Sequence, residues 1–164
     1  MEVYGGLQFE IFNEEDVDVL TPIMKRAFDE DTQRHLNQPT GGPDGYDNGD
    51  FLRKYALNPA SQAYKVSKDG KPIGAVIVWI KENNVNFLGN IFLDPEFQDK
   101  GLGLIIWEFI ESKYPATVKW YTDTPGFSRR NHNFYVNKCG FKVVKIKNPR
   151  DKYNGTYILE KQIK

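Results

Sequence analysis

Two glycines stand at the start of an apolar helical segment, within the stretch LDPEFQDKGLGLIIWEF that covers residues 93–109. The backbone N–H groups at a helix N-terminus have no partner inside the helix, and they can converge on an anion with help from the helix dipole. Gly101 and Gly103 carry no Cβ atom that would block a close approach. The stretch QDKGLG, residues 98–103, can therefore hold an anion, although glycines at a helix start are common and do not identify the ligand.

Two nucleotide-binding motifs use the same kind of junction but fit this stretch less well. A P-loop requires a lysine and a hydroxyl residue directly after its last glycine, whereas Leu104 and Ile105 follow Gly103. A dinucleotide fingerprint needs a tight turn before the glycines, a third small residue and an acidic residue about 20 positions later. Asp123 meets the last requirement. The long segment DPEFQDK before the glycines and Ile106 at the third position do not meet the other two. An NAD-dependent oxidoreductase is kept as an alternative that these departures argue against.

Hydrophobic periodicity and turn residues predict the elements that would hold this loop. Strands are expected at 7–12, 63–67, 73–80, 85–93, 117–122, 141–147 and 155–163, and helices at 13–28, 50–57, 101–114 and 128–141. The first helix contains Pro22, which either kinks it or starts a second helix capped by Thr21. One strand–helix–strand crossover makes one pair parallel, so we expect an α/β fold with a mixed, mostly antiparallel sheet of about seven strands and about four helices. The whole chain, 1–164, is expected to form one domain.

A second motif lies in the last predicted helix, where Tyr135 precedes the Gly140-Phe141 pair that ends it. Together, IFLDPEFQDKGLG and NHNFYVNKCGF resemble the GNAT superfamily of acyl-CoA N-acyltransferases, and KRAF in the first helix is also similar. The resemblance covers essentially the whole chain, and it implies the same order of elements. The family signature, Gln/Arg-x-x-Gly-x-Gly/Ala, is matched here by Gln98, Gly101 and Gly103.

The resemblance implies that acetyl-CoA is a co-substrate and that no metal is required. In the family, amides of the glycine loop bind the coenzyme A pyrophosphate, and the strand before the loop pairs with the pantetheine arm. An asparagine seven positions before the tyrosine often contacts the cofactor; that position is Ser128 here, and the role stays open between Ser128 and the nearby Asn131. The cofactor-binding residues carried over are Phe92, Leu93, Gln98, Asp99, Lys100, Gly101, Leu102, Gly103, Leu104 and Asn131.

The chemistry that the resemblance implies is direct attack of a neutral amine on the thioester. Tyr135 is then the catalytic proton donor to the departing thiolate, because a tyrosine with a pKa of about 10 suits that role. The expected strand 85–93 contains no carboxylate that could accept the amine's proton. The general base therefore stays open between Glu82, Asp123 and an ordered water. A protein that binds acyl-CoA without catalysing transfer, a sensor, is the alternative that the missing carboxylate favours.

The acceptor amine is suggested by one acidic segment, residues 29–50, which we expect to be a long loop over the acceptor site. The segment contains six carboxylates and only one arginine, so it would raise the local concentration of a cation. Tyr46 and Phe51 could stack on the cation or cover its methylene groups. We therefore expect a small cationic amine as acceptor, although a solvated loop without that role explains the composition equally well. The carboxylates are Asp29, Glu30, Asp31, Asp44, Asp47 and Asp50.

The overall composition narrows the class of protein further. With 22 basic and 22 acidic residues in 164, the chain lacks the excess of positive charge typical of nucleic-acid-binding domains, so no nucleic-acid partner is expected. No apolar stretch approaches the roughly 20 residues that span a bilayer, and the start lacks a secretory pattern, so we expect a cytoplasmic protein without a membrane partner. Cys139 is the only cysteine, which we expect to be a buried small residue. Dimers are frequent in the GNAT superfamily, so a homodimer is one assembly that the resemblance allows.

Overall fold

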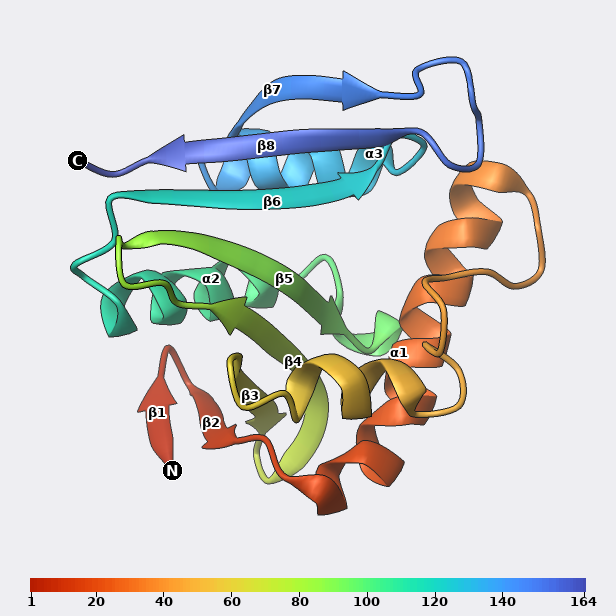
Figure 1. Ribbon diagram of the computed structural model, residues 1–164. Helices are drawn as coiled ribbons and strands as arrows, with labels where there is room; N and C mark the ends of the chain where they lie inside the picture. The colour runs from red at the N-terminus through yellow and green to blue at the C-terminus, as the bar shows by residue number, and fades with distance from the viewer.

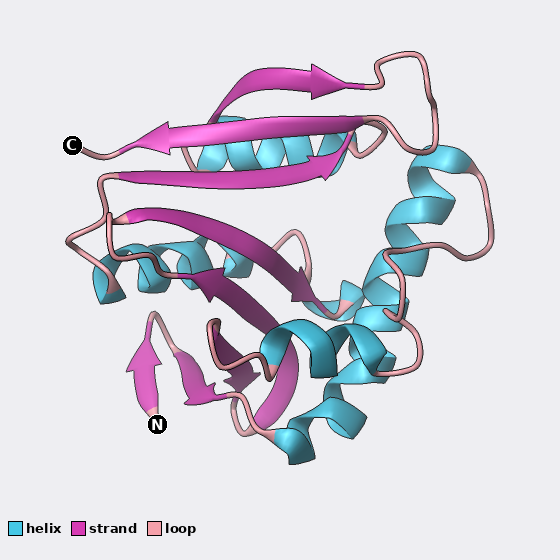
Figure 2. Cartoon of the chain, in the orientation of Figure 1, coloured by secondary structure: helices cyan, strands magenta, loops and turns pink.

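The computed structural model describes residues 1–164, which build one eight-stranded sheet (Figures 1 and 2). The strands follow one another across the sheet in the order β1-β2-β3-β4-β5-β6-β8-β7. Only β5 and β6 are parallel; all other neighbours are antiparallel, as the sequence predicts. The strands are β1 Glu2–Tyr4, β2 Leu7–Ile11, β3 Gln62–Lys68, β4 Lys71–Trp79, β5 Val85–Leu93, β6 Lys119–Pro125, β7 Lys142–Lys147 and β8 Thr156–Gln162.

The strand that the sequence analysis missed is β1, at one edge of the sheet. It forms a hairpin with β2 through Gly5 and Gly6, whose φ angles are 56° and 82°. Consecutive residues with positive φ give the turn geometry that matches the twist of a hairpin, and glycine adopts it without strain. Because β1 has only three residues, it is too short to show a hydrophobic alternation in the sequence.

Helix α1 spans Glu14–Leu36 as a single helix capped by Asn13. Pro22 lies inside it and does not start a second helix. Thr21, the alternative cap, instead donates its hydroxyl hydrogen to the carbonyl oxygen of Val17 at 2.7 Å. The first expected helix is therefore continuous through the proline.

The expectation of a long loop over residues 29–50 is wrong for residues 29–36, which form the last turns of α1. Glu30 and Arg34 form an ion pair at 2.7 Å along the helix, and pairs with this spacing stabilise a helix. Asn37, with a φ of 55°, ends the helix in the left-handed conformation. The true connection is therefore residues 37–49, and three of the six carboxylates belong to a helix.

The remaining helices are η1 (Leu52–Ala56), α2 (Leu102–Lys113) and α3 (Arg129–His132), which continues directly into η3 (Asn133–Lys138); η2 (Pro95–Phe97) is a single 3₁₀ turn. With α3 and η3 taken as one helix, the expected set of about four helices is present. Helices α1 and η1 cover one face of the sheet, and α2 and α3–η3 cover the other (Figures 1 and 2). None of these helices combines the length and apolar character needed to cross a membrane.

The core has two parts, one on each face of the sheet, and β4 is buried between them. Val76 and Val78 pack in the cluster that contains α2, whereas Ala75 and Ile77 pack in the cluster that contains α1. Successive side chains of a strand point to opposite faces, so a strand covered on both sides is apolar throughout. This central strand gives β5, its neighbour, a rigid support on one side.

Candidate active site

The glycine loop leaves six consecutive backbone N–H groups free. None of the amides of residues 99–104 donates a hydrogen bond within the chain. Asp99 and Gly101 have positive φ angles of 59° and 78°, and α2 begins directly afterwards. Left-handed residues before a helix turn successive N–H groups toward a common point, which is the geometry of an anion-binding nest.

Side chains fix the start of this loop on β5. The Asp94 carboxylate accepts a hydrogen bond from the amide of Glu96 at 3.2 Å, and it pairs with Arg26 of α1 at 2.6 Å. Gln98 donates from Nε2 to the carbonyl oxygen of Leu93 at 3.0 Å. Asp94 thus caps the turn η2, and Gln98 is partly buried. Together these bonds hold the loop in one conformation before a ligand binds.

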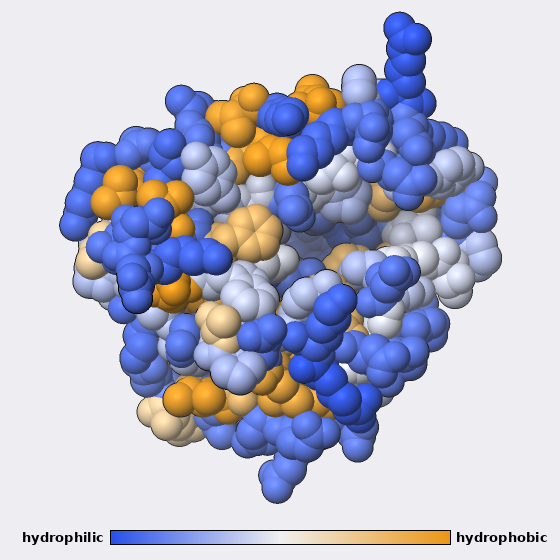
Figure 3. Space-filling view, viewed as in Figure 1, coloured by the Kyte–Doolittle hydropathy of each residue, from blue (hydrophilic) through white to orange (hydrophobic).

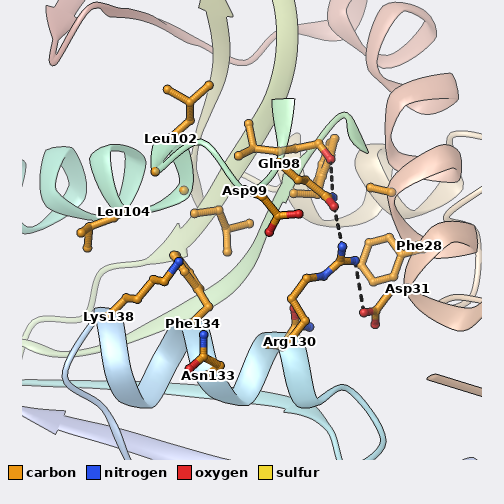
Figure 4. A pocket seen from close by; sticks show the side chains of 17 residues that line it. Phe28, Asp31, Gln98, Asp99, Leu102, Leu104, Arg130, Asn133, Phe134 and Lys138 are labelled. Atoms are coloured by element: carbon orange, nitrogen blue, oxygen red, sulfur yellow. Dashed lines mark hydrogen bonds and ion pairs between the residues drawn. The ribbon is translucent and has the colours of Figure 1, made fainter. Parts of the chain in front are cut away.

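A cavity of about 180 Å³ lies between this loop, α1 and the α3–η3 helix (Figure 4). All the residues predicted to bind the cofactor line it except Lys100, whose ammonium group lies 5.7 Å from the centre of the Phe97 ring. At Gly103 an added Cβ would lie 3.1 Å from the Phe134 ring, so this glycine lets the helix start approach α3–η3. The residues of the predicted set that line the cavity are Phe92, Leu93, Gln98, Asp99, Gly101, Leu102, Gly103, Leu104 and Asn131.

The sequence analysis missed Arg130, which joins three segments at the rim of this cavity. Its guanidinium donates to Oε1 of Gln98 at 2.6 Å and lies 3.3 Å from Asp31 of α1 (Figure 4). It also lies 2.6 Å from Glu30 of the same helix. Burial acts to raise the pKa of Glu30, but the hydrogen bond and positive charge of Arg130 outweigh it and keep that pKa below 4.5. An arginine at the start of a short helix has no distinguishing pattern in the sequence, so only the fold reveals this role.

Ser128 and Asn131, between which the sequence leaves the cofactor contact open, differ in their position at the cavity. Ser128 is completely buried and donates its hydroxyl hydrogen to Asp31 at 3.0 Å. Asn131 lines the cavity, and its Nδ2 donates to the Thr124 hydroxyl at 3.2 Å. Asn131 therefore has the position from which a ligand can be reached, and Ser128 supports the helix start.

The parallel strands β5 and β6 separate halfway along their length. Their pairing begins at Val85 with Lys119 and ends at Leu88 with Thr122. Beyond that point β5 pairs only with β4, and β6 pairs only with β8. A bulge at Gly89, which has no partner across β4, coincides with the separation, and bulges commonly redirect strands beside active sites.

The separated part of β5 exposes backbone groups to the gap. The amide of Asp94 donates to Ile73 beside β4 at 2.7 Å, whereas the carbonyl oxygen of Leu93 accepts from Gln98 on the opposite side. Because backbone groups of a strand alternate in direction, Ile91 and Leu93 direct theirs toward the gap, where no strand lies. An extended chain with amide groups can pair with such a free edge.

Tyr135 lies next to the point where the strands separate. Its ring is buried against Phe134 and Phe141, with centroid distances of 5.3 and 5.8 Å. Burial is the main reason that the pKa of Tyr135 is raised above 10, and a hydrogen bond with the Thr122 hydroxyl only partly opposes it. The hydroxyl therefore keeps its proton at neutral pH and can act as a donor.

Cys139 packs beside the Tyr135 ring in the same buried cluster. Burial raises the pKa of its thiol to about 12, so the nucleophilic thiolate is scarce at neutral pH. The expected structural role of this cysteine agrees with its position.

A second cavity, of about 410 Å³, lies on the face of the sheet that carries η1. The space-filling view shows this face hollowed between η1 and the β6–β8 strands (Figure 3). Of the two candidate bases, Asp123 lines this cavity and Glu82 does not. Asp123 lies within β6, and burial raises the pKa of its carboxyl group, opposed by the charge of Lys147. The lining residues are Phe51, Tyr55, Ile77, Trp79, Lys81, Phe87, Gly89, Asn90 and Asp123.

The acidic residues of α1 do not surround this cavity. Asp29 accepts hydrogen bonds from the Tyr46 hydroxyl at 2.5 Å and from Lys25 at 2.5 Å. Burial acts to raise the pKa of Asp29, but these bonds outweigh it and lower that pKa. Asp31 is buried beside Arg130 and Ser128. These carboxylates are engaged within the protein, so the expectation of six free charges over an acceptor is wrong.

Comparison with solved structures gives the same fold. An acetyltransferase of Thermus thermophilus superimposes with a TM-score of 0.76 at 16% identity, covering 96% of this chain and 97% of that one. The PaiA N-acetyltransferase of Thermoplasma acidophilum, solved in complex with coenzyme A, gives 0.74 at 16% identity over 96% and 99% of the two chains.

Sequence comparison adds a relative and a family. The Bacillus subtilis (strain 168) protein YrkN is 45% identical over 91 residues, which are 55% of this chain and 49% of YrkN. The matched part thus spans about half the length of that relative. The model of the acetyltransferase (GNAT) family matches residues 24–141, from α1 to the end of the helix that carries Tyr135. The chain therefore belongs to the acetyltransferase (GNAT) family.

Proposed function

We propose that this protein transfers the acetyl group of acetyl-CoA to a primary amine of a small cationic acceptor. The observation that carries the proposal is the separation of β5 from β6 beyond Leu88 and Thr122. Residues 91–93 of β5 line the cavity beside the glycine loop, and residues 89–90 line the second cavity. One short stretch of strand thus borders both cavities, so a donor in one can meet an acceptor in the other.

The first cavity has the chemistry that coenzyme A requires. The free amides of residues 99–104 suit a pyrophosphate, and the strand edge at Ile91, which faces the gap, suits the amide groups of a pantetheine arm; the carbonyl of Leu93 already accepts from Gln98. The proposal that coenzyme A binds in this cavity is further supported by PaiA, which shares this fold and was solved in complex with coenzyme A. On this proposal, the predicted set from Phe92 to Asn131 holds the co-substrate, and Arg130 and Lys138 at the cavity add positive charge for its phosphates.

The protein's residues supply two proton transfers. The ammonium group first loses one proton to solvent, and the neutral amine nitrogen then forms a bond to the thioester carbonyl carbon while the carbon–sulfur bond breaks. Asp123, or a water beside it, accepts the proton that the amine loses, and Tyr135 donates its hydroxyl proton to the departing sulfur. The proton held by Asp123 returns through solvent to Tyr135, so the products are an N-acetylated amine and the free thiol.

The alternative of a catalytically silent sensor rested on the lack of a carboxylate in the strand before the glycine loop. Asp123 now supplies a carboxylate from the neighbouring strand β6, at the cavity where an amine would lie. This position favours an enzyme. We expect it to act in the cytoplasm without a metal, as a monomer or a homodimer.

Calorimetry and a thiol-release assay test the proposal. The protein should bind acetyl-CoA and not NAD, and it should release coenzyme A thiol only when an amine is present, with the acetylated amine detected by mass spectrometry. Acetyl-CoA binding without turnover of any amine would support the sensor instead. NAD binding without acetyl-CoA binding would contradict both.

A further inference from the structure

Four of the nine residues that line the second cavity are aromatic. Tyr55 comes from η1 and Phe51 directly precedes that helix, whereas Trp79 comes from β4 and Phe87 from β5. The absence of a side chain at Gly89 leaves room for the Trp79 indole, because an added Cβ at residue 89 would lie 2.8 Å from the indole nitrogen. Walls of this kind recognise a flat apolar body, and aromatic faces also attract a cation.

The charges around this cavity allow only one positive charge to be paired. Asp123 is its single carboxylate, and Lys81 is the only cation that lines it. The exposed carboxylates of the 37–50 segment, Asp44, Asp47 and Asp50, do not line it. A ligand with a second ammonium group would find no second acid and would be repelled by Lys81.

One polar group at the cavity also lacks a partner. Asn90 lines the cavity beside the strand separation, and its buried Oδ1 atom accepts no hydrogen bond. A buried acceptor without a donor is costly, and an amine N–H group is a donor of the kind that is missing. Asn90 and Asp123 together offer two acceptors for one nitrogen.

We propose that the second cavity selects an arylalkylamine, a primary amine with one positive charge and a flat aromatic body, over polyamines. The ring lies among the aromatic side chains of η1, β4 and β5, and the nitrogen lies toward Asp123 and the end of the parallel pairing. This assignment rests on the transferase proposed above and narrows its acceptor. The cavity volume of about 410 Å³ suits a ligand of that size.

A panel of three amines tests this selectivity with acetyl-CoA held constant. We expect kcat/KM for 2-phenylethylamine to exceed that for n-butylamine by about tenfold or more, because only the former buries a ring. Spermidine should be turned over less efficiently than 2-phenylethylamine. Equal values for 2-phenylethylamine and n-butylamine, or a higher value for spermidine, would overturn the assignment and leave the transferase intact.

A matched pair of variants tests whether the ring of the amine binds beside Tyr55. Tyr55 is partly exposed on η1, so Tyr55→Ala should preserve the fold, raise KM for 2-phenylethylamine about tenfold and change KM for n-butylamine little. Tyr153→Ala makes the same change at an exposed residue far from the cavity lining and should leave both values unchanged. Equal effects of Tyr55→Ala on the two amines would count against a ring site at η1.

Calorimetry separates failure of this assignment from failure of the transferase. If no amine is acetylated, binding of 2-phenylethylamine to the complex with coenzyme A is measured in the wild type and in Tyr55→Ala. Binding that weakens in the variant supports the cavity assignment although the transferase has failed. No binding in the wild type overturns the assignment.

Discussion

The two cavities beside the β5–β6 gap are built from different parts of the chain. The glycine-loop cavity relies on backbone groups that are contiguous in sequence, the free amides of residues 99–104. The aromatic cavity relies on side chains brought together from η1, β4, β5 and β6. A backbone site can be read from a short motif because glycine spacing and a helix start define it. A site of converging side chains has no such local pattern.

The difference also concerns the ligands that each cavity can take. Backbone amides recognise phosphate groups irrespective of the side chains around them, so this part of the site suits a co-substrate common to many enzymes. Aromatic and charged side chains distinguish one amine from another. We therefore expect substitutions to divide into those that affect co-substrate binding and those that affect the acceptor, with Tyr135 between the two groups.

The largest effect is expected at Tyr135, which is buried in the core, lines neither cavity and lies beside Thr122 at the end of the β5–β6 pairing. Tyr135→Phe keeps the buried ring and removes the proton donor, so kcat should fall by about 10²–10⁴-fold while calorimetry shows unchanged acetyl-CoA affinity. Tyr4→Phe, the same change at a residue packed on Phe109, is the control. Unchanged kcat in Tyr135→Phe would remove the donor role.

The next largest effect is expected on the acceptor side, at Asp123. If Asp123 is the base, Asp123→Asn should lower kcat/KM by about 10²-fold and abolish the acid limb of the wild-type pH profile. That limb should lie above the ordinary carboxyl pKa of 3.8, because burial raises the pKa of Asp123. Glu82→Gln should change kcat/KM less than about twofold, and an unaltered pH profile in Asp123→Asn would favour water as the base.

The same substitution makes a prediction about stability. A carboxyl pKa that is raised on folding means that the folded state binds the proton more tightly than the unfolded state, so the ionised group opposes folding at neutral pH. Asp123→Asn should therefore not lower the Tm at pH 7. A clear loss of thermal stability would show that the carboxylate has a structural partner instead of an acceptor-site role.

Substitution of Arg130, which lines the glycine-loop cavity, should lower the stability of the folded protein. Arg130→Gln leaves Glu30 and Asp31 without their cation, so the free energy of unfolding at pH 7 should fall by about 2 kcal/mol in thermal or denaturant unfolding. Because Arg130 keeps the pKa of Glu30 below 4.5, the difference should diminish as the pH falls through the folded-state pKa. Arg129→Gln, at the exposed neighbouring residue, should have little effect at any pH.

Gly103 provides a graded test of the backbone site. An added Cβ would lie 3.1 Å from the Phe134 ring, so Gly103→Ala should weaken acetyl-CoA binding slightly and Gly103→Leu should weaken it by about tenfold. Saturating acetyl-CoA should largely restore kcat. If Gly103→Leu binds as tightly as the wild type, the co-substrate does not lie against this helix start.

The smallest effect is expected from the exposed acids of the connection after α1. The double substitution Asp44→Asn and Asp47→Asn should change kcat/KM for a cationic amine by less than about twofold at physiological salt, because exposed charges away from the cavity are screened. The assay is repeated at low salt. A loss of tenfold or more would restore the hypothesis that this segment attracts the acceptor.

The element order, the parallel pair, the glycine loop and the Tyr135 helix were predicted from sequence, because they depend on local periodicity, turn residues and a motif. The end of α1 was not predicted, because the acidic stretch DEDTQRHL looks polar, and the partners of Glu30 and Asp31 are Arg130 and Ser128, which lie far away in the sequence. The edge strand β1 was also missed because of its length.

The sequence by itself therefore determined the fold class, the glycine loop at the start of α2 and the likeness to acyltransferases, since each of these is encoded in contiguous residues. The tertiary structure decided how the charged residues are used. It turned Asp29, Glu30 and Asp31 into internal partners, placed Arg130 at the glycine-loop cavity and left Asp123 as the one carboxylate that lines the second cavity. Residues far apart in the chain can pair or line a cavity only after the sheet has brought them together, so their roles depend on packing that no short stretch of sequence contains.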